Sequence, residues 1–310
     1  MDRRTVLIGL GAMAGAGDIG AAADGGYVEE LGAMPSRLIG ADAVTVWLPP
    51  GYAGGNGRCG VLYMQDGQNL FDPARAYGGV AWRVDAVIAQ LMAANAIRPL
   101  IVVGIANLGK DRPRQYTPEA VHDRLSTAWR ERWDREWGGP PFSNAYLKFM
   151  VDELKPVIDR RYRTLAGPGD TLVMGSSMGG LISLYALAEY PQVFGRAGCL
   201  STHWPLFLPA PEDFAKPRSS LPYESEAIGA MRDYLQSKLG PPQGRKLWFD
   251  RGTATLDAEY APYQTAVDLE LAQLGWQRGR DFESRVYPGA EHNETSWHAR
   301  LADPLRFLCA

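Results

Sequence analysis

Short apolar runs alternate with longer amphipathic segments along most of this chain. The apolar runs predict buried strands, because a strand covered on both faces has no polar side. From residue 61 onward strands and helices alternate, which is typical of an α/β protein with a mostly parallel central sheet and helices on both faces. The expected strands run from 42 to the prolines at 49–50 and over 61–64, 100–105, 172–174, 197–201, 246–249 and 284–287, and the expected helices over 82–96, 144–162, 181–190, 225–239, 257–274 and 296–308.

No internal repeat, low-complexity tract or clean linker divides the 310 residues, so we expect one domain over 24–310. The region 106–143 interrupts the alternation with many charges and prolines, and we interpret it as an insertion. Within it, Trp129, Trp133 and Trp137 recur every four residues and share one helix face. Core packing is the favoured interpretation of this stripe. The alternative is an apolar wall or lid over an aromatic or acyl substrate.

The first residues have the pattern of an export signal rather than of a folded element. An arginine pair at 3–4 precedes small apolar residues at 5–16, and three alanines at 21–23 fit a cleavage site. The apolar run is too short to span a bilayer. We therefore expect a secretory signal of the twin-arginine type over 1–23 and a periplasmic or secreted mature protein. The alternative is a cytoplasmic protein with a loose apolar N-terminus.

Composition narrows the class of protein further. Apolar residues make up 46% of the chain, enough for a large core. The net charge of −3 gives no general footprint for nucleic acid. Three scattered cysteines without a C-x-x-C pair indicate neither a disulfide framework nor a zinc site. No segment of 18 apolar residues follows the N-terminus, so we expect no stable membrane insertion.

The sequence GSSMG at 175–179 lies between an expected strand and an expected helix, which is the context of a nucleophile elbow. The chain must reverse sharply at the serine, and Gly175 and Gly179 leave room for that reversal. The helix that follows points its positive end at the hydroxyl. The pattern predicts Ser177, rather than Ser176, as a nucleophile. The alternative is an ordinary glycine-rich turn.

A serine hydroxyl needs a base, and the chain has four histidines. His292 follows the last expected strand directly, where an α/β-hydrolase fold presents its base, and is our candidate. His298 falls inside the final helix, where a surface or packing role is expected, and His122 falls in the insertion. Residues near the same sheet edge are candidates for substrate contact: His203, Trp204 and Trp82.

The third group of a triad is an acid that orients the imidazole and stabilises its charged form. Asp257 lies one loop beyond the strand 246–249, and the order Ser177, Asp257, His292 is that of α/β hydrolases. Asp257 could instead cap the helix that begins there. Asp250, at the strand end, and Glu259 are the alternatives, and we expect Asp250 to bond the backbone of its own loop.

An oxyanion hole needs two backbone donors. One candidate is the N–H of Met178, which follows the nucleophile. The other is the N–H of Gln68, in the turn after the strand 61–64, where Gly67 would let the backbone turn inward. The alternative is a plain type II turn.

Four motifs in order are similar to the putative esterase family of α/β hydrolases: YMQDGQNLFD, GSSMGG, DRGT followed by LD, and GAEHNETSW. The family includes enterobactin, feruloyl and acetylxylan esterases, S-formylglutathione hydrolase and mycolyltransferases. The resemblance covers about residues 40 to 308 and implies serine-dependent cleavage of carboxylic esters without metal or cofactor. It assigns the nucleophile to Ser177, the base to His292 and the oxyanion turn to 66–68. Many members carry the acid sooner, where this chain has Ala254 and Thr255.

These observations favour a periplasmic or secreted serine esterase that acts on a small-molecule or carbohydrate-linked ester. A peptidase could use the same triad. An acyltransferase could use it too, if an alcohol other than water resolves the acyl-enzyme. A non-catalytic binding protein on the same fold is disfavoured, because it would have no chemical reason to keep Ser177, Asp257 and His292.

Overall fold

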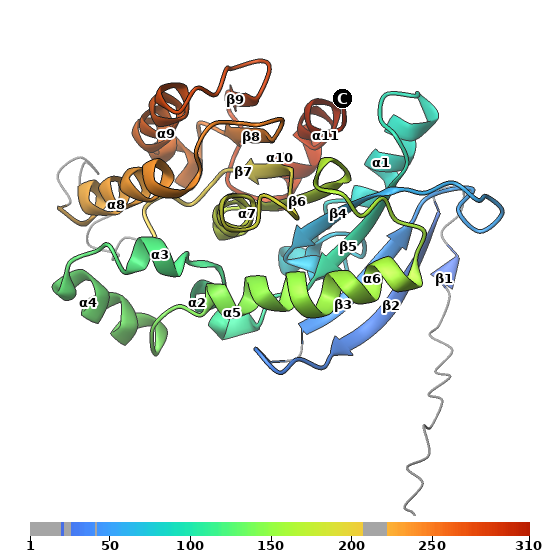
Figure 1. Ribbon diagram of the computed structural model, residues 1–310, viewed down its shortest axis with the longest axis horizontal. Coiled ribbons are helices and arrows are strands. Elements are labelled where there is room, and N and C mark those ends of the chain that lie inside the picture. The colour runs from blue at the N-terminus through green and yellow to red at the C-terminus, as the bar shows by residue number, and fades with distance from the viewer. Residues whose placement is uncertain (1–19, 22–25, 41, 207–221) are drawn as a thin grey trace, which may run out of the picture.

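The centre of the fold is a sheet that most of the helices cover on its two faces (Figure 1). The computed structural model describes residues 20–21, 26–40, 42–206 and 222–310. In this part of the chain the strand order is β1-β2-β3-β5-β4-β6-β7-β8-β9. The strands are β1 (Gly20–Ala21), β2 (Tyr27–Met34), β3 (Asp42–Leu48), β4 (Gly60–Gln65), β5 (Leu100–Ile105), β6 (Thr171–Ser176), β7 (Arg196–Leu200), β8 (Lys246–Arg251) and β9 (Phe282–Val286). The six strands β4 to β9 pair in parallel, in the order β5-β4-β6-β7-β8-β9. Strands β1, β2 and β3 pair antiparallel and lie beyond β5.

Alternate residues of each central strand enter two separate cores. Val61 and Tyr63 of β4 belong to one core, and Leu62 and Met64 belong to the other. The first core packs under α5 (Ser143–Lys148), a π-helical turn (Phe149–Leu154), α6 (Lys155–Arg161), α7 (Met178–Glu189), α8 (Pro222–Lys238) and α9 (Ala261–Gln273). The second packs under α1 (Val84–Ala93), α10 (Glu294–Arg300) and α11 (Ala302–Cys309). The predicted mostly parallel sheet with helices on both faces is therefore confirmed.

The predicted elements are present, but several boundaries differ. The expected helix 257–274 begins as a 3-10 helix (Thr255–Tyr260) before α9. The expected helix 296–308 is two helices, α10 and α11, which meet at Leu301. Strand β2 was not expected. It has no continuous apolar run, it pairs with the two-residue strand β1 and with β3, and its register against β3 shifts between Glu30 and Gly32.

The region 106–143 folds mainly as three helices: α2 (Arg112–Tyr116), α3 (Glu119–His122) and α4 (Thr127–Trp137). Trp129 and Trp133 of α4 are buried and contact the ring of His122 edge-on, with centroid distances of 6.4 and 5.2 Å. Core packing is thus the correct interpretation of the tryptophan stripe.

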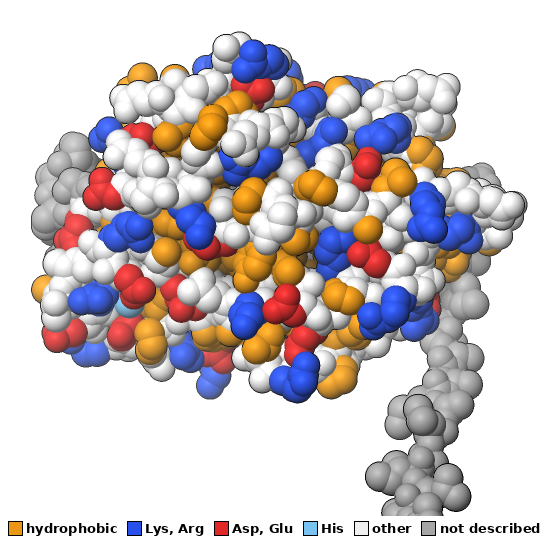
Figure 2. Space-filling view, viewed as in Figure 1, with side chains coloured by type: hydrophobic (Ala, Val, Ile, Leu, Met, Phe, Trp, Pro, Cys, Tyr) orange, Lys and Arg blue, Asp and Glu red, His pale blue; other side chains and the backbone are white. Residues whose placement is uncertain are grey.

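Most of the expected export signal lies outside the described residues, which include only Gly20–Ala21 of it as β1. Among the described residues, none of the helices has the length and apolarity needed to cross a membrane. On the face shown in Figure 2, acidic and basic side chains are interspersed rather than gathered by sign. That face offers no extended basic surface of the kind that binds nucleic acid.

Close packing before β7 gives a first prediction. A Cβ added to Gly195 would lie 2.3 Å from the carbonyl oxygen of Pro168, which also accepts the Gly195 N–H. We expect Gly195→Ala to lower the free energy of unfolding by about 1–3 kcal/mol. Gly167→Ala is the matched control, because Gly167 has ordinary extended backbone and open space around it. Urea unfolding measures both variants, and equal stability of the two would contradict this account.

Candidate active site

The chain reverses sharply between β6 and α7, and Ser177 lies at the reversal. Its backbone has φ 57° and ψ −124°, a region that L-residues rarely adopt and that costs about 1–3 kcal/mol. Two hydrogen bonds hold this conformation from the neighbouring strand and loop. The Ser177 N–H donates to the carbonyl of Leu200 at 2.9 Å, and the Ser177 carbonyl accepts the N–H of His203 at 3.2 Å. Hydrogen bonds from the end of β7 and from the loop after it therefore hold Ser177 in its strained conformation.

Glycines on either side of Ser177 are required by close contacts. A Cβ on Gly175 would lie 2.7 Å from the carbonyl carbon and oxygen of Gly179. A Cβ on Gly179 would lie 3.1 Å from Cβ of Gln65. The steric reason expected from the GSSMG motif thus holds in three dimensions, since any side chain at Gly175 would force the turn open.

The loop after β9 brings His292 to Asp257. His292 Nδ1 and Asp257 Oδ1 are 2.6 Å apart, which meets the distance expected for a triad acid and its base. An ionised carboxylate can only accept, so Nδ1 carries the proton and Nε2 is left as the basic nitrogen. The His292 ring also meets Trp297 edge-on at 5.0 Å and Tyr260 at 5.7 Å between centroids. These contacts fix the plane of the imidazole.

Asp257 is fully buried and accepts three hydrogen bonds. Besides His292, its donors are the hydroxyl of Ser201 and the backbone N–H of Gly252, both at 2.6 Å to Oδ2. Burial alone would raise the pKa of Asp257, but the hydrogen bond and charge of His292 and the other two donors outweigh it and lower the pKa. The carboxylate is therefore ionised at neutral pH, and it is not a helix cap.

Asp250 has a different environment from the one expected. Instead of bonding its own loop, its Oδ1 accepts from Arg300 at 2.9 and 3.1 Å and from the N–H of Ser201 at 3.2 Å. Its Oδ2 accepts from the indole of Trp248 at 2.8 Å. Burial raises the pKa of Asp250, and the Arg300 charge and these donors offset the rise only partly. Among the described residues, the carboxylate hydrogen-bonded to His292 is that of Asp257.

The two candidate oxyanion donors, the N–H groups of Met178 and Gln68, each lie in the first turn of a helix. Met178 is the first residue of α7, and Gln68 lies in a 3-10 helix (Gly67–Asn69) after β4. The left-handed backbone that turns the chain is at Asp66, with φ 55°, and not at Gly67 as expected. Gly67 is needed for another reason: a Cβ there would lie 2.5 Å from the backbone of Gly104 in β5.

Residues of the region 106–143 support this turn. Arg112 of α2 forms two hydrogen bonds of 2.7 Å with the carboxylate of Asp66, and the Asn107 amide adds a third at 2.7 Å. The hydroxyl of Tyr116 accepts the Asp66 N–H at 3.1 Å. These partners cannot be predicted from the sequence, because the pattern of charges over 106–143 does not indicate which carboxylate each one contacts.

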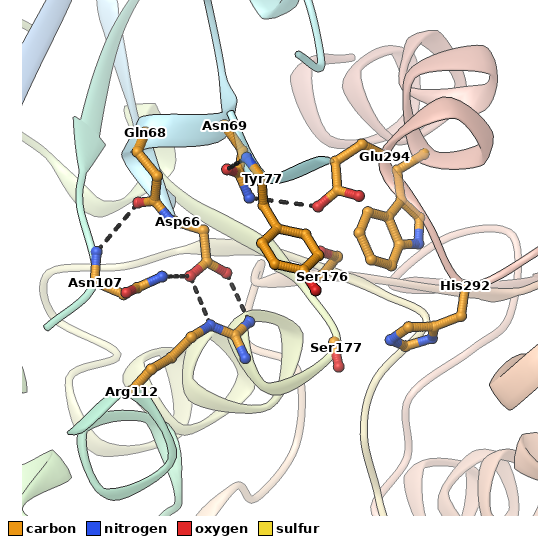
Figure 3. A pocket seen from close by; sticks show the side chains of 11 residues that line it. Asp66, Gln68, Asn69, Tyr77, Asn107, Arg112, Ser176, Ser177, His292 and Glu294 are labelled. Atoms are coloured by element: carbon orange, nitrogen blue, oxygen red, sulfur yellow. Dashed lines mark hydrogen bonds and ion pairs between the residues drawn. The ribbon is translucent and has the colours of Figure 1, made fainter. Parts of the chain in front are cut away.

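A cavity of about 300 Å³ opens where these elements meet, and Ser177 and His292 both line it. In Figure 3 the His292 ring points toward Ser177, with Tyr77 and Arg112 on the other side of the opening. The Tyr77 side chain is 79% exposed, and Gln68 is also part of the lining. The remaining lining residues are Asp66, Asn69, Asn107, Ser176, Glu294 and Trp297. In the described ranges, no cluster of three or more His, Cys, Asp or Glu side chains is arranged to hold a metal.

The three expected substrate contacts do not line this cavity. His203 is buried, with Nδ1 2.8 Å from the Tyr260 hydroxyl. Trp204 is buried and donates to Gln264 at 3.2 Å. Trp82 is buried against Trp297, which lines the cavity in its place. Trp204 and Trp82 do not line the cavity because they pack in the two hydrophobic cores, and His203 does not because its ring lies against Tyr260. His298 has the expected packing role, since its Nδ1 donates to the Trp82 carbonyl at 2.7 Å.

The comparison with protein families gives a match over nearly the whole described domain. The model of the family described as "Putative esterase" matches residues 38–308. Among curated proteins, the Bacillus subtilis ferri-bacillibactin esterase BesA is 26% identical over 152 residues, 46% of this chain and 48% of that protein. The uncharacterised Bacillus subtilis protein YbbA is 25% identical over 177 residues, 56% of this chain and 62% of that protein. The matches thus span about half to three fifths of these relatives.

Solved structures share the fold. An IroE-like serine hydrolase from Shewanella oneidensis superposes with a TM-score of 0.62 at 22% identity, over 91% of this chain and 79% of that one. The Shigella flexneri enterobactin esterase FES, solved with enterobactin, gives 0.64 at 15% identity, over 91% and 58%. A feruloyl esterase module from Clostridium thermocellum, complexed with sinapinate, gives 0.60 at 15% identity, over 93% and 89%. The expected α/β-hydrolase fold is confirmed.

The lowered pKa of Asp257 predicts how stability depends on pH. Its folded pKa lies below the unfolded value of about 3.9, so the ionised carboxylate stabilises the fold above that pH. This stabilisation is lost as the pH falls through the folded pKa. We expect the gap in unfolding free energy between wild type and Asp257→Asn to stay open above about pH 4 and to shrink as the pH falls further. Urea unfolding followed by tryptophan fluorescence measures it. A gap that stays constant or widens would contradict the assigned sign.

Proposed function

The chain belongs to the putative esterase family, and we propose that it hydrolyses carboxylic esters through a Ser177–His292–Asp257 triad and an acyl-enzyme. The observation that carries this proposal is the 2.6 Å contact between Asp257 and His292 beside a cavity that Ser177 also lines. When a buried carboxylate binds one nitrogen of an imidazole, it fixes the orientation and tautomer of the ring, so that the other nitrogen can accept a proton from the serine. The strained backbone of Ser177 adds support, because such strain persists where function requires it.

In this mechanism His292 Nε2 accepts the proton of Ser177 as the hydroxyl oxygen attacks the ester carbonyl. The carbonyl oxygen becomes an oxyanion, and the N–H groups of Met178 and Gln68 donate to it. His292 then gives its proton to the departing alcohol, which leaves an acyl group on Ser177. Water repeats the sequence to release the acid. Asp257 stays ionised throughout and stabilises the imidazolium.

The residues that line the cavity are suited to a polar substrate. Arg112 is the cation among its lining residues, and it is already paired with Asp66, so it offers little net positive charge to an anion. Asn69 and Asn107 add uncharged polar groups, and Glu294 adds an acceptor. Burial raises the pKa of Glu294, and the charge of Asp66 adds to this. We therefore propose hydroxyl-bearing small-molecule or carbohydrate-linked esters as substrates.

Hydrolysis of model esters tests the nucleophile. We expect Ser177→Ala to lower kcat on p-nitrophenyl acetate by about 10⁴- to 10⁶-fold, because no other group replaces its oxygen. Asp257→Asn should cost about 10³- to 10⁴-fold with little change in KM. Ser176→Ala should retain most of the activity, since Ser176 ends β6 before the reversal. A fluorophosphonate probe should label wild type and Ser176→Ala but not Ser177→Ala.

Equal losses in the two serine variants, or a loss in Ser176→Ala alone, would refute the assignment. The same assay compares a feruloyl ester and a catecholate trilactone with the acetate. These esters come first because the relatives and neighbours include enzymes named for feruloyl esters, enterobactin and ferri-bacillibactin. Product formed only when a second alcohol is added would indicate an acyltransferase instead, and cleavage of amides alone would indicate a peptidase.

We further propose that the protein acts in the periplasm or outside the cell. The support is the arginine pair at 3–4, the small apolar run at 5–16 and the alanines at 21–23. N-terminal sequencing of the protein from its native host should find a mature chain that begins near Asp24. Soluble active protein that retains Met1 would refute export by this signal.

A further inference from the structure

The side chain of Ser201, in the loop after β7, has all its hydrogen-bonding capacity occupied. Its oxygen lies 2.9 Å from the indole nitrogen of Trp297 and 2.7 Å from a guanidinium nitrogen of Arg300. Both of these groups can only donate, so they occupy the two lone pairs of the hydroxyl. The one proton of Ser201 is thereby directed to Oδ2 of Asp257, at 2.6 Å.

The backbone at Ser201 connects this hydroxyl to the nucleophile. Ser201 has φ 43°, which is left-handed and uncommon for a residue other than glycine. Its N–H donates to the carbonyl of Asp250 at 2.9 Å. The residues on either side of this stretch hold Ser177: Leu200 accepts its N–H, and His203 donates to its carbonyl. One short loop thus contacts the elbow through its backbone and the acid through its side chain.

The charges around Ser201 match the needs of a protonated histidine. Asp250, Asp257 and Arg300 are all buried, and Arg300 lies 2.9 Å from Asp250 and 3.7 Å from Asp257. The cluster has one more negative than positive charge while His292 is neutral, and it becomes balanced when His292 is protonated. Because charges interact strongly in a protein interior, this arrangement stabilises the imidazolium that forms transiently in the proposed reaction.

We propose that Ser201 is a positioning residue for the acid of the triad, held in place by Trp297 and Arg300. Its hydroxyl fixes Oδ2 of Asp257, so that Oδ1 faces Nδ1 of His292. It also withdraws negative charge from the carboxylate and thereby moderates the basicity of His292. This inference rests on the triad proposed above.

Removal of the hydroxyl has two consequences. Asp257 loses one of its two donors at Oδ2 and becomes less well oriented, so kcat should fall by about 10- to 100-fold while KM changes little. The remaining charge on Asp257 acts more strongly on His292, so the acid limb of kcat/KM should move to higher pH. Within the described part of the chain, the charged or titratable groups around this pair include Arg300, Asp250, Glu294 and Tyr260, with His203 behind Tyr260, and all remain in the variants.

The experiment compares Ser201→Ala and Ser201→Gly with Ser183→Ala in the full chain. Ser201→Gly removes the same hydroxyl but suits the left-handed backbone, so it guards against a fold too strained to test. Ser183 is an equally buried serine in α7 whose hydroxyl donates to the Gly179 carbonyl at 2.7 Å, away from the cluster. For each variant, kcat, KM and the pH profile of kcat/KM are measured on p-nitrophenyl acetate.

We expect both Ser201 variants to lose kcat and to shift the acid limb to higher pH, and Ser183→Ala to do neither. Activity and pH profile like those of Ser183→Ala would overturn the inference. A loss of kcat with an unmoved acid limb would overturn it too, because it would indicate a structural role only. Ser177→Ala, assayed in parallel, separates the two proposals: if it remains active, the triad itself is wrong.

Discussion

A buried carboxylate stays ionised only when donors surround it, and the site of this protein depends on one such group. The three donors to Asp257 follow three adjacent parallel strands: Ser201 follows β7, Gly252 follows β8 and His292 follows β9. Ser177 follows β6, the next strand in the same order. Parallel strands present their carboxyl ends at one edge, so the order of strands alone brings together residues far apart along the chain.

That topological rule explains how much of the site was predictable. A glycine-flanked serine between a strand and a helix, and a histidine after the last strand, are local patterns with a fixed place in the fold, so Ser177 and His292 could be chosen from sequence. The acid was harder, because several carboxylates follow β8. The wall of the cavity was not predictable: Arg112 reaches Asp66 from 46 residues away, and Tyr77 gives no periodic signal.

The same distinction applies to the fold. Strands such as β4 and β5 are predictable because all their residues are buried, and a fully buried strand has a nearly continuous run of apolar residues. Strand β2 could not be predicted from the pattern, because its residues are at most partly buried and its register against β3 shifts between Glu30 and Gly32. The aromatic residues His203, Trp204 and Trp82 were misjudged because sequence position gives the strand end but not the direction of the side chain. Direction is decided by packing, which the pattern does not encode.

The ion pair between Arg112 and Asp66 limits how the region 106–143 of this chain can be exchanged. Segments that connect helices and strands generally tolerate changes of length, yet here the region after β5 supplies a cation and, in Tyr116, a phenol to the turn that carries Gln68. Replacement of the whole segment by one of another length would leave a nearly buried carboxylate without its counter-ion. A chimera that exchanges this segment must therefore transplant both contacts with it. Variation in the region 106–143 is thus physically coupled to the turn that carries Gln68.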